Sequence, residues 1–141
     1  MKSRHSDLKQ ICRQFGVVAL YTFGSQAKKI KDWMEGCQDD IPLSTSDVDI
    51  GVRVISGANF SVTEKAKLAL SLEDLFGSNR VDLVLLSQAD PFLAAEIIRG
   101  ERLFTRDEHE ADEYELYVLR RAGDLAPLER ERMALVLGEI T

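Results

Sequence analysis

The sequence contains few residues of several types, and each scarcity excludes a class of protein. Its 141 residues include two cysteines, two histidines and three prolines. Cys12 and Cys37 lack the spacing of a zinc site, so we expect reduced thiols, with Cys12 on a helix and Cys37 in a loop. No apolar stretch approaches the roughly 20 residues that span a bilayer, and residues 1–5 are followed by polar sequence rather than a signal-peptide core. We therefore expect a cytoplasmic protein with no membrane partner.

Basic residues are also in deficit. Eighteen lysines and arginines stand against 24 aspartates and glutamates, which gives a net charge of −6. Tight, sequence-independent binding to nucleic acid needs a basic surface, so this balance argues against it, whereas a basic protein partner is compatible with it. His5 and His109 lie in polar helical contexts, and we expect both on the surface rather than in a catalytic role.

Against this background, two aspartates stand two positions apart in a β-branched stretch, residues 46–52. Side chains alternate between the faces of a strand, so Asp47 and Asp49 point the same way while the valines and isoleucine between them enter a core. Two carboxylates about 7 Å apart at Cα, at about 3.3 Å per residue, repel each other unless a cation lies between them. Oxygen ligands favour Mg²⁺. The alternative is that these aspartates cap helices or end turns.

A third aspartate opens another apolar stretch, residues 81–86. A lone carboxylate in a buried strand costs several kcal/mol if it is unpaired and unsolvated. Placed beside the first strand, Asp82 completes a cluster with Asp47 and Asp49. Three such carboxylates can hold two metal ions about 3.5–4 Å apart.

Gly24 and Ser25 end a third apolar stretch, residues 17–23, just before a predicted helix. Backbone N–H groups and a hydroxyl at a helix N-terminus favour phosphate, although the same turn can be purely structural. Lys28 and Lys29 follow closely and either approach the phosphates or only solvate the helix. The chain lacks the glycine-rich P-loop pattern. With the carboxylates, the turn predicts a nucleoside triphosphate site of another kind.

Hydrophobic periodicity predicts alternating helices and strands, and therefore an α/β fold with a small sheet flanked by helices. The expected helices cover residues 6–15, 26–35, 61–76, 90–99 and 107 onward, and the expected strands cover 17–23, 47–54, 81–86 and 102–105. Gly123 and Pro127 are expected to separate a last helix that ends near residue 137. Phe92 is taken as an apolar position of its helix, and Trp33 either packs on the core or belongs to a base or partner surface. The pattern leaves the strand directions open.

These motifs together resemble a known family. The segments 23–27, 46–49 and 81–82, with the helix–glycine–strand segment 95–104, are similar to the minimal nucleotidyltransferases of the DNA polymerase β-like superfamily, among them the MntA-type antitoxins. The resemblance covers about residues 8–105 of the sequence. It implies a small mixed sheet flanked by helices over a domain of residues 1–105. Residues 106–141 would then be a C-terminal helical extension that packs on this domain or on a partner.

The resemblance also implies an activity and a set of site residues. Family members bind two Mg²⁺ ions and transfer a nucleoside monophosphate, AMP when ATP is the donor, to a hydroxyl, with pyrophosphate as the leaving group. By match, Asp47, Asp49 and Asp82 are the catalytic and metal-binding residues, and Asp82 also helps to deprotonate the acceptor. Gly24 and Ser25 contact the triphosphate by the same match, and Lys28 is added to the nucleotide site because of its charge and its position just after the turn.

Two features depart from the family pattern, and they leave three functions open. Lys29 stands where the last glycine of the phosphate turn is usual, and residues 30–46 form a longer spacer than is common. The leading hypothesis is an antitoxin that transfers AMP to a HEPN ribonuclease toxin. The alternatives are a binding module that neutralises its partner by contact alone, and an aminoglycoside-type nucleotidyltransferase. In the last case residues 106–141 or a homo-oligomer would shape the acceptor site.

Overall fold

Helices and strands alternate along the chain as the hydrophobic pattern predicts. The computed structural model describes residues 3–36, 47–55, 60–78 and 80–137. Cys37 and the spacer expected to be a loop, residues 37–46, lie outside the described residues. The elements in order are α1 (Arg4–Phe15), β1 (Val17–Phe23), α2 (Ala27–Met34), β2 (Val48–Val54), α3 (Val62–Phe76), β3 (Val81–Leu85), the short 3₁₀ helix η2 (Leu86–Gln88), α4 (Pro91–Ile98), β4 (Glu101–Thr105) and α5 (Glu108–Val136).

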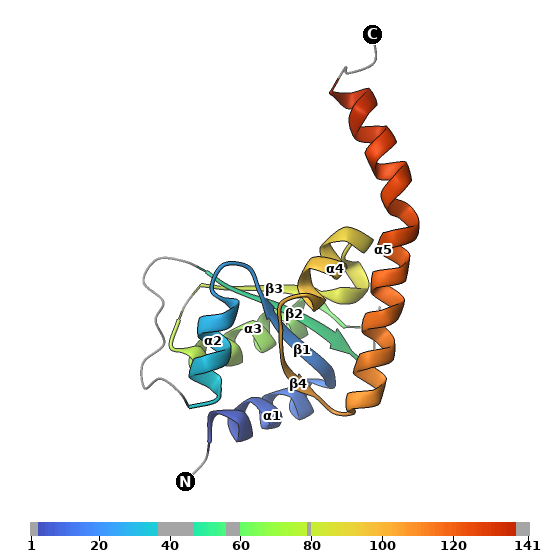
Figure 1. Ribbon diagram of the computed structural model, residues 1–141. Coiled ribbons are helices and arrows are strands. Elements are labelled where there is room, and N and C mark those ends of the chain that lie inside the picture. The colour runs from blue at the N-terminus through green and yellow to red at the C-terminus, as the bar shows by residue number, and fades with distance from the viewer. Residues whose placement is uncertain (1–2, 37–46, 56–59, 79, 138–141) are drawn as a thin grey trace.

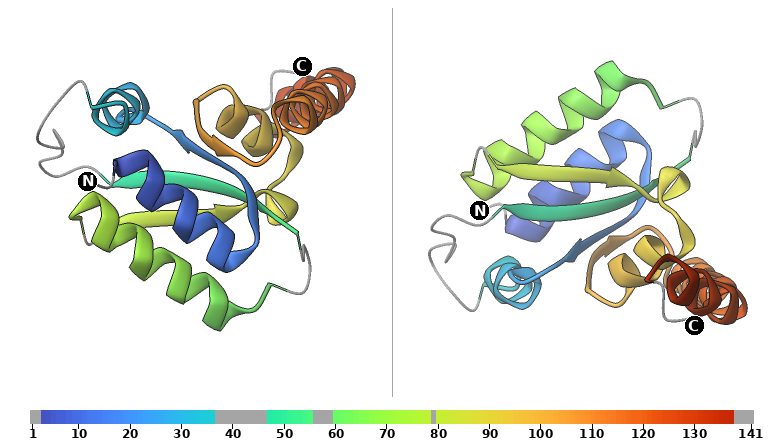
Figure 2. Two further views of the ribbon diagram at one scale, coloured as in Figure 1. Left: turned by 90° about the horizontal axis from the view of Figure 1, so that it is seen from below. Right: turned by 90° about the horizontal axis from the view of Figure 1, so that it is seen from above.

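The four strands form one mixed sheet in the order β3-β2-β1-β4. Strand β1 is antiparallel to both β2 and β4, whereas β2 and β3 run parallel. This confirms the predicted mixed sheet and supplies the strand directions that periodicity left open. Helices α1 and α3 cover one face, while α4 and the first half of α5 lie against the other (Figures 1 and 2). Helix α2 packs beside β1 and β4.

The alternation along the strands divides the core between these two faces. Val48, Ile50 and Val52 of β2 are fully buried on the face of α1 and α3. Trp33 of α2 also belongs to this core, with its ring centroid 5.7 Å from that of Phe76, which confirms the core reading for this side chain. A second apolar cluster lies under α4 and α5. Asp49 alternates with these residues along β2 and is therefore on the face of α4.

Two helices begin at side-chain caps. The Ser61 hydroxyl accepts a hydrogen bond from the Glu64 backbone N–H at the start of α3. The Asp90 carboxylate accepts from the N–H groups of Phe92 and Leu93, and Pro91 occupies the first position of α4. Such caps satisfy donors that have no partner within the helix. They set where α3 and α4 start relative to the strands that they cover.

The prediction of two C-terminal helices is wrong, because α5 runs without a break through Gly123 and Pro127. Proline removes one N–H and leaves the carbonyl four residues earlier without a partner. Both residues are exposed, so water can bond that carbonyl and the helix continues. The second half of α5 projects beyond the body and exposes Leu128, Leu135 and Val136 (Figure 1). No helix within the described ranges has both the length and the apolar content to cross a bilayer.

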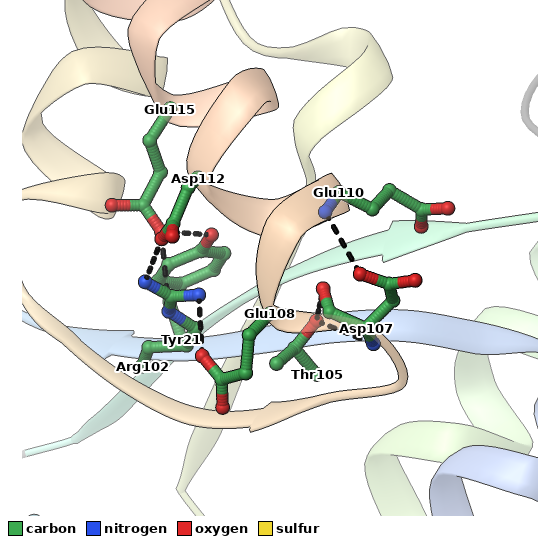
Figure 3. A network of polar contacts seen from close by, with 8 residues as sticks. All are labelled: Tyr21, Arg102, Thr105, Asp107, Glu108, Glu110, Asp112 and Glu115. Carbon is green, nitrogen blue, oxygen red and sulfur yellow. Dashed lines mark hydrogen bonds and ion pairs between the residues drawn. The ribbon is translucent and has the colours of Figure 1, made fainter.

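A network of polar contacts around one arginine helps to hold the first half of α5 to the sheet. Arg102 of β4 pairs with Glu108, Asp112 and Glu115 of α5, at N–O distances of 3.1, 2.8 and 3.2 Å (Figure 3). The hydroxyl of Tyr21, which is fully buried in β1, donates to Glu115 at 2.8 Å. Charge-assisted bonds of this kind are stronger than neutral ones. The extension is therefore anchored to the sheet over its first two turns.

Candidate active site

Strand register brings the predicted site residues to one end of the sheet. Phe23, the last residue of β1, pairs with Asp49 of β2. Asp49 in turn pairs with Asp82 of β3. At the other edge, Thr22 pairs with Glu101 at the start of β4. The C-terminus of β1 therefore meets the N-termini of the other three strands, and the Gly24 turn lies beside the aspartates.

The three aspartates share one face and differ in their surroundings. Asp49 is half-buried, while Asp47 and Asp82 are exposed. Burial raises the pKa of the Asp49 carboxyl above its usual value, and the negative charges of Asp82, Asp47 and Glu96 raise it further. Asp47 pairs with Arg80, whose Nε lies 3.2 Å from Oδ1. Asp49 is thus a carboxylate held among like charges, an environment that a bound cation would relieve.

The three carboxylates are the type of ligand that suits Mg²⁺, and the strand register places Asp49 beside Asp82. Carboxylate oxygens are the ligands that this ion prefers, and neighbouring strands carry them side by side. Within the described ranges, no three acidic, histidine or cysteine side chains are grouped closely enough to hold one ion. The exposed carboxylate of Asp47 turns toward Arg80 instead of toward Asp49. For all three carboxylates to bind the same metal ions, the Asp47 carboxylate must leave Arg80 and turn toward them.

Gly24 is the point at which the turn touches the carboxylate cluster. Its φ of +83° lies in the left-handed region that glycine adopts without strain. A Cβ at this position would lie 2.6 Å from Oδ2 of Asp49, which is closer than real Cβ contacts. The backbone conformation of the turn therefore favours glycine, and a Cβ would also push the Asp49 carboxylate from its present position.

Replacing Gly24 with alanine should separate these two requirements. We expect Gly24→Ala to destabilise the protein by about 2–3 kcal/mol, because left-handed strain costs about 1–2 kcal/mol and the contact with Asp49 adds to it. Gly77→Ala is the matched control, since Gly77 has φ +66° and open space around its Cβ position. Chemical unfolding of both variants measures the difference. Equal losses would show that the approach to Asp49 is not tight.

Helix α2 starts directly after this turn, with the Ala27 N–H bonded to the Gly24 carbonyl and, among the described residues, no side chain that caps the N–H groups following it. Its N-cap residue, Gln26, makes no side-chain capping bond. The first N–H groups of a helix have no partner inside the helix and carry partial positive charge. Oε1 of Gln26 is buried without a hydrogen-bond partner among the described residues. Ser25 and Lys28 are exposed beside these groups, as a phosphate-binding turn requires.

An open cavity of about 810 Å³ adjoins this turn. Its volume lies within the range of small-molecule sites. The residues around it are Gly24, Ser25, Ala27, Lys28, Phe92, Glu96, Arg99, Gly100 and Glu101. All three predicted nucleotide-binding residues are therefore on its wall. None of the three aspartates is on its wall, although Gly24, which is, lies directly against Asp49. A separate cavity of about 610 Å³ runs along β4 toward α1 and has none of the three aspartates on its wall either.

Sequence reasoning missed the residues that α4 contributes to this cavity. Phe92, taken above as an apolar position of its helix, is 37% exposed and adjoins the cavity, together with Glu96 and Arg99. The helix buries Ala94, Ala95, Ile97 and Ile98 instead. The signal was present, because positions i, i+4 and i+7 lie on one side of a helix. A phenylalanine on the same side as two charged residues indicates an exposed face.

Comparison with known proteins decides the family. The sequence model described as "Polymerase beta, Nucleotidyltransferase" matches residues 6–109, which is well over half of the chain. The chain belongs to the polymerase β nucleotidyltransferase family. The match covers β1, β2 and β3, the strands that carry or adjoin the predicted site residues. No curated protein sequence matches the chain.

Several solved structures share the fold. One is a crystal structure of the MntA–HepT toxin–antitoxin pair that carries two Asp→Glu substitutions two positions apart. A chain of that structure superposes with a TM-score of 0.69 at 18% identity, covering 97% of this chain and 98% of that one. A toxin–antitoxin structure with AMP-PNP gives 0.65 at 19% identity, covering 97% and 98%. A tri-AMPylated HEPN toxin of Shewanella oneidensis in complex with an MNT antitoxin gives 0.64 at 18%, covering 98% and 97%. At these identities the likeness establishes the fold, including the long α5.

Proposed function

We propose that this protein transfers AMP from ATP to a hydroxyl group of a HEPN ribonuclease toxin and thereby acts as its antitoxin in the cytoplasm. The observation that carries this proposal is the register that pairs Phe23 with Asp49 and Asp49 with Asp82. It aligns the carboxylates beside the end of the strand that leads into the Gly24 turn. Metal ligands and a phosphate-binding turn at one sheet end are what nucleotidyl transfer requires.

In the proposed reaction the protein positions charge and takes part in no covalent bond. Gly24, Ser25 and Lys28 bind the triphosphate, with the first N–H groups of α2 directed at it. Asp47, Asp49 and Asp82 are assigned to two Mg²⁺ ions, which supply charge neutralisation and lower the pKa of the attacking hydroxyl.

The balance of the step follows from these roles. The acceptor oxygen bonds to the α phosphorus, the bond from that phosphorus to the bridging oxygen breaks, and pyrophosphate leaves with the electron pair. Asp82 lies on the edge strand β3 and is exposed. An acceptor can therefore approach it, so we assign it the proton released by the hydroxyl.

The choice of a protein acceptor is supported by the similar structures and by α5. The structures of this fold named above are toxin–antitoxin complexes, and one contains an AMPylated toxin. The second half of α5 leaves Leu128, Leu135 and Leu137 more than 60% exposed. Exposed apolar side chains of this kind suit a protein partner. They also favour the second candidate function, neutralisation of the toxin by contact alone.

Mass spectrometry of the toxin tests the proposal. We expect incubation of a HEPN toxin with this protein, ATP and Mg²⁺ to add AMP to a toxin tyrosine, and we expect EDTA to prevent the addition. Excess Mg²⁺ should restore it, because the three carboxylates need a bound cation to take part in the reaction. Toxin that is bound and inhibited but never modified would contradict the enzymatic proposal and leave contact neutralisation.

Thermal unfolding with nucleotide separates the same two candidates without a partner. A ligand that binds the native state at a hundred times its Kd stabilises it by about 2.7 kcal/mol. We therefore expect saturating ATP with Mg²⁺ to raise the melting temperature by several degrees, and ATP with EDTA to have a much smaller effect. An unchanged melting temperature would favour the contact binder.

A further inference from the structure

One side of helix α4 faces the cavity and has no structural role in the core. Phe92, Glu96 and Arg99 occupy positions i, i+4 and i+7 and adjoin the same cavity as Gly24 and Lys28. The opposite side of the helix supplies the buried residues, and Ile97 there lies so close to Gly51 of β2 that a Cβ on Gly51 would overlap it. The helix is therefore pressed against the sheet, and its cavity-facing side has a defined position.

The cavity wall carries charges of both signs, with Lys28 and Arg99 as cations and Glu96 and Glu101 as carboxylates. Among the described residues, neither Lys28 nor Arg99 has a carboxylate within ion-pairing distance, although both adjoin the cavity. Five of the other arginines pair with carboxylates, namely Arg53, Arg80, Arg102, Arg106 and Arg132. Glu101 pairs with Lys31 at 3.2 Å, which leaves Glu96 as the carboxylate that shares the cavity wall with Lys28 and Arg99. Two cations without an ion pair on one cavity wall suit an anionic ligand.

Close packing places Arg99 next to the Gly24 turn, and the rise of the helix sets the distance from Arg99 to Phe92. A Cβ on Gly100 would overlap the carbonyl oxygen of Thr22, so the end of α4 lies directly against the end of β1 and next to the Gly24 turn. Phe92 lies seven residues back along the helix, about 10 Å at 1.5 Å per residue. A nucleoside triphosphate separates its base from its terminal phosphates by a comparable length.

We propose that α4 forms the second wall of the nucleotide site, in which Arg99 binds the polyphosphate opposite Lys28 and Phe92 stacks on the base. This rests on the proposed function and assigns two residues to its substrate. The guanidinium of arginine can bond phosphate oxygens in a bidentate manner, and an exposed aromatic ring stacks on any base. Glu96 lies between them and adds to the negative charge around Asp49.

The assignment predicts different ligand dependence for the two residues. Binding of ATP and of AMP, each with Mg²⁺, is measured by calorimetry on the full chain. Arg99→Ala should weaken ATP binding about tenfold, the loss of one charge-assisted contact, and AMP binding much less. Phe92→Ala should weaken both nucleotides by a similar factor of about ten, since both carry the base, and Phe92→Tyr should restore binding.

Two exposed residues away from the cavity serve as matched controls. Arg120→Ala on α5 and Leu70→Ala on α3, where Leu70 is 60% exposed, should leave both affinities unchanged. Equal weakening of ATP and AMP by Arg99→Ala, or no weakening by Phe92→Ala, would overturn the assignment. If the wild-type protein bound no ATP, both the assignment of α4 and the proposed function would be overturned. Wild-type binding that both variants retain would overturn only the role of α4.

Discussion

Replacement of Asp49 by asparagine is expected to abolish nucleotidyl transfer and to stabilise the metal-free protein. Asp49 is the most enclosed of the three aspartates, and it stands between Asp82 and the Gly24 turn. Metal ions supply several kcal/mol of transition-state stabilisation, so loss of this ligand should lower the transfer rate at least about a thousandfold. The side chain keeps its shape, while the repulsion from Asp82, Asp47 and Glu96 disappears.

The sign of the stability effect follows from the pKa. Because folding raises the pKa of Asp49, the ionised carboxylate destabilises the native state at neutral pH. The penalty is lost as the pH falls through the raised pKa and Asp49 takes up a proton. Melting temperatures in EDTA should therefore be higher for Asp49→Asn than for wild type at pH 7, and the difference should shrink on acidification.

An exposed aspartate on the other side of the molecule provides the control. Asp74 lies on α3, so Asp74→Asn should leave both the transfer rate and the melting temperature nearly unchanged. A variant Asp49→Asn that transfers AMP at the wild-type rate would remove this residue from the metal site. One that is less stable than wild type in EDTA would show that the carboxylate is satisfied in the native state.

The second large effect is expected at Gly100, where α4 turns into β4. A Cβ on this residue would overlap the Thr22 carbonyl oxygen and crowd Phe23, and both groups belong to the central strand β1. Backbone cannot move aside as a side-chain tip can, so Gly100→Ala should cost about 3 kcal/mol. Because the same contact places Arg99 beside the Gly24 turn, nucleotide affinity should fall as well.

Gly123 offers the opposite result from the same substitution. It lies inside α5 with open space at its Cβ position, so Gly123→Ala should stabilise the protein by up to about 1 kcal/mol through helix propensity. Urea unfolding of the two variants measures both changes. A Gly100→Ala variant as stable as wild type would mean that the junction between α4 and β1 can open without cost.

Much of this site is predictable from the sequence because it depends on local spacing. The two-residue interval between Asp47 and Asp49 is enough to place both on one side of a strand. The pairing of Asp49 with Asp82 could not be predicted, since it depends on β2 and β3 being parallel neighbours in a particular register. Periodicity contains no information about which strands are adjacent. Resemblance to a family supplied that expectation.

One missed feature and one mistaken expectation have physical causes of their own. The exposure of Phe92 was missed, although its neighbours on the helix face are charged. Pro127 was expected to end a helix, yet it lies where α5 is exposed and water can replace the lost hydrogen bond. In both cases solvent exposure decided the outcome, and exposure depends on which elements pack together.

Transfer from differently labelled ATP tests the central claim most directly. The protein, a HEPN toxin and Mg²⁺ are incubated with ATP that carries the label at either the α or the γ phosphorus, and the label on the toxin is counted. We expect label from the α position only, released pyrophosphate, and none of this with Asp49→Asn. Label from the γ position, or equal α label with the variant, would contradict a nucleotidyltransferase built on these aspartates.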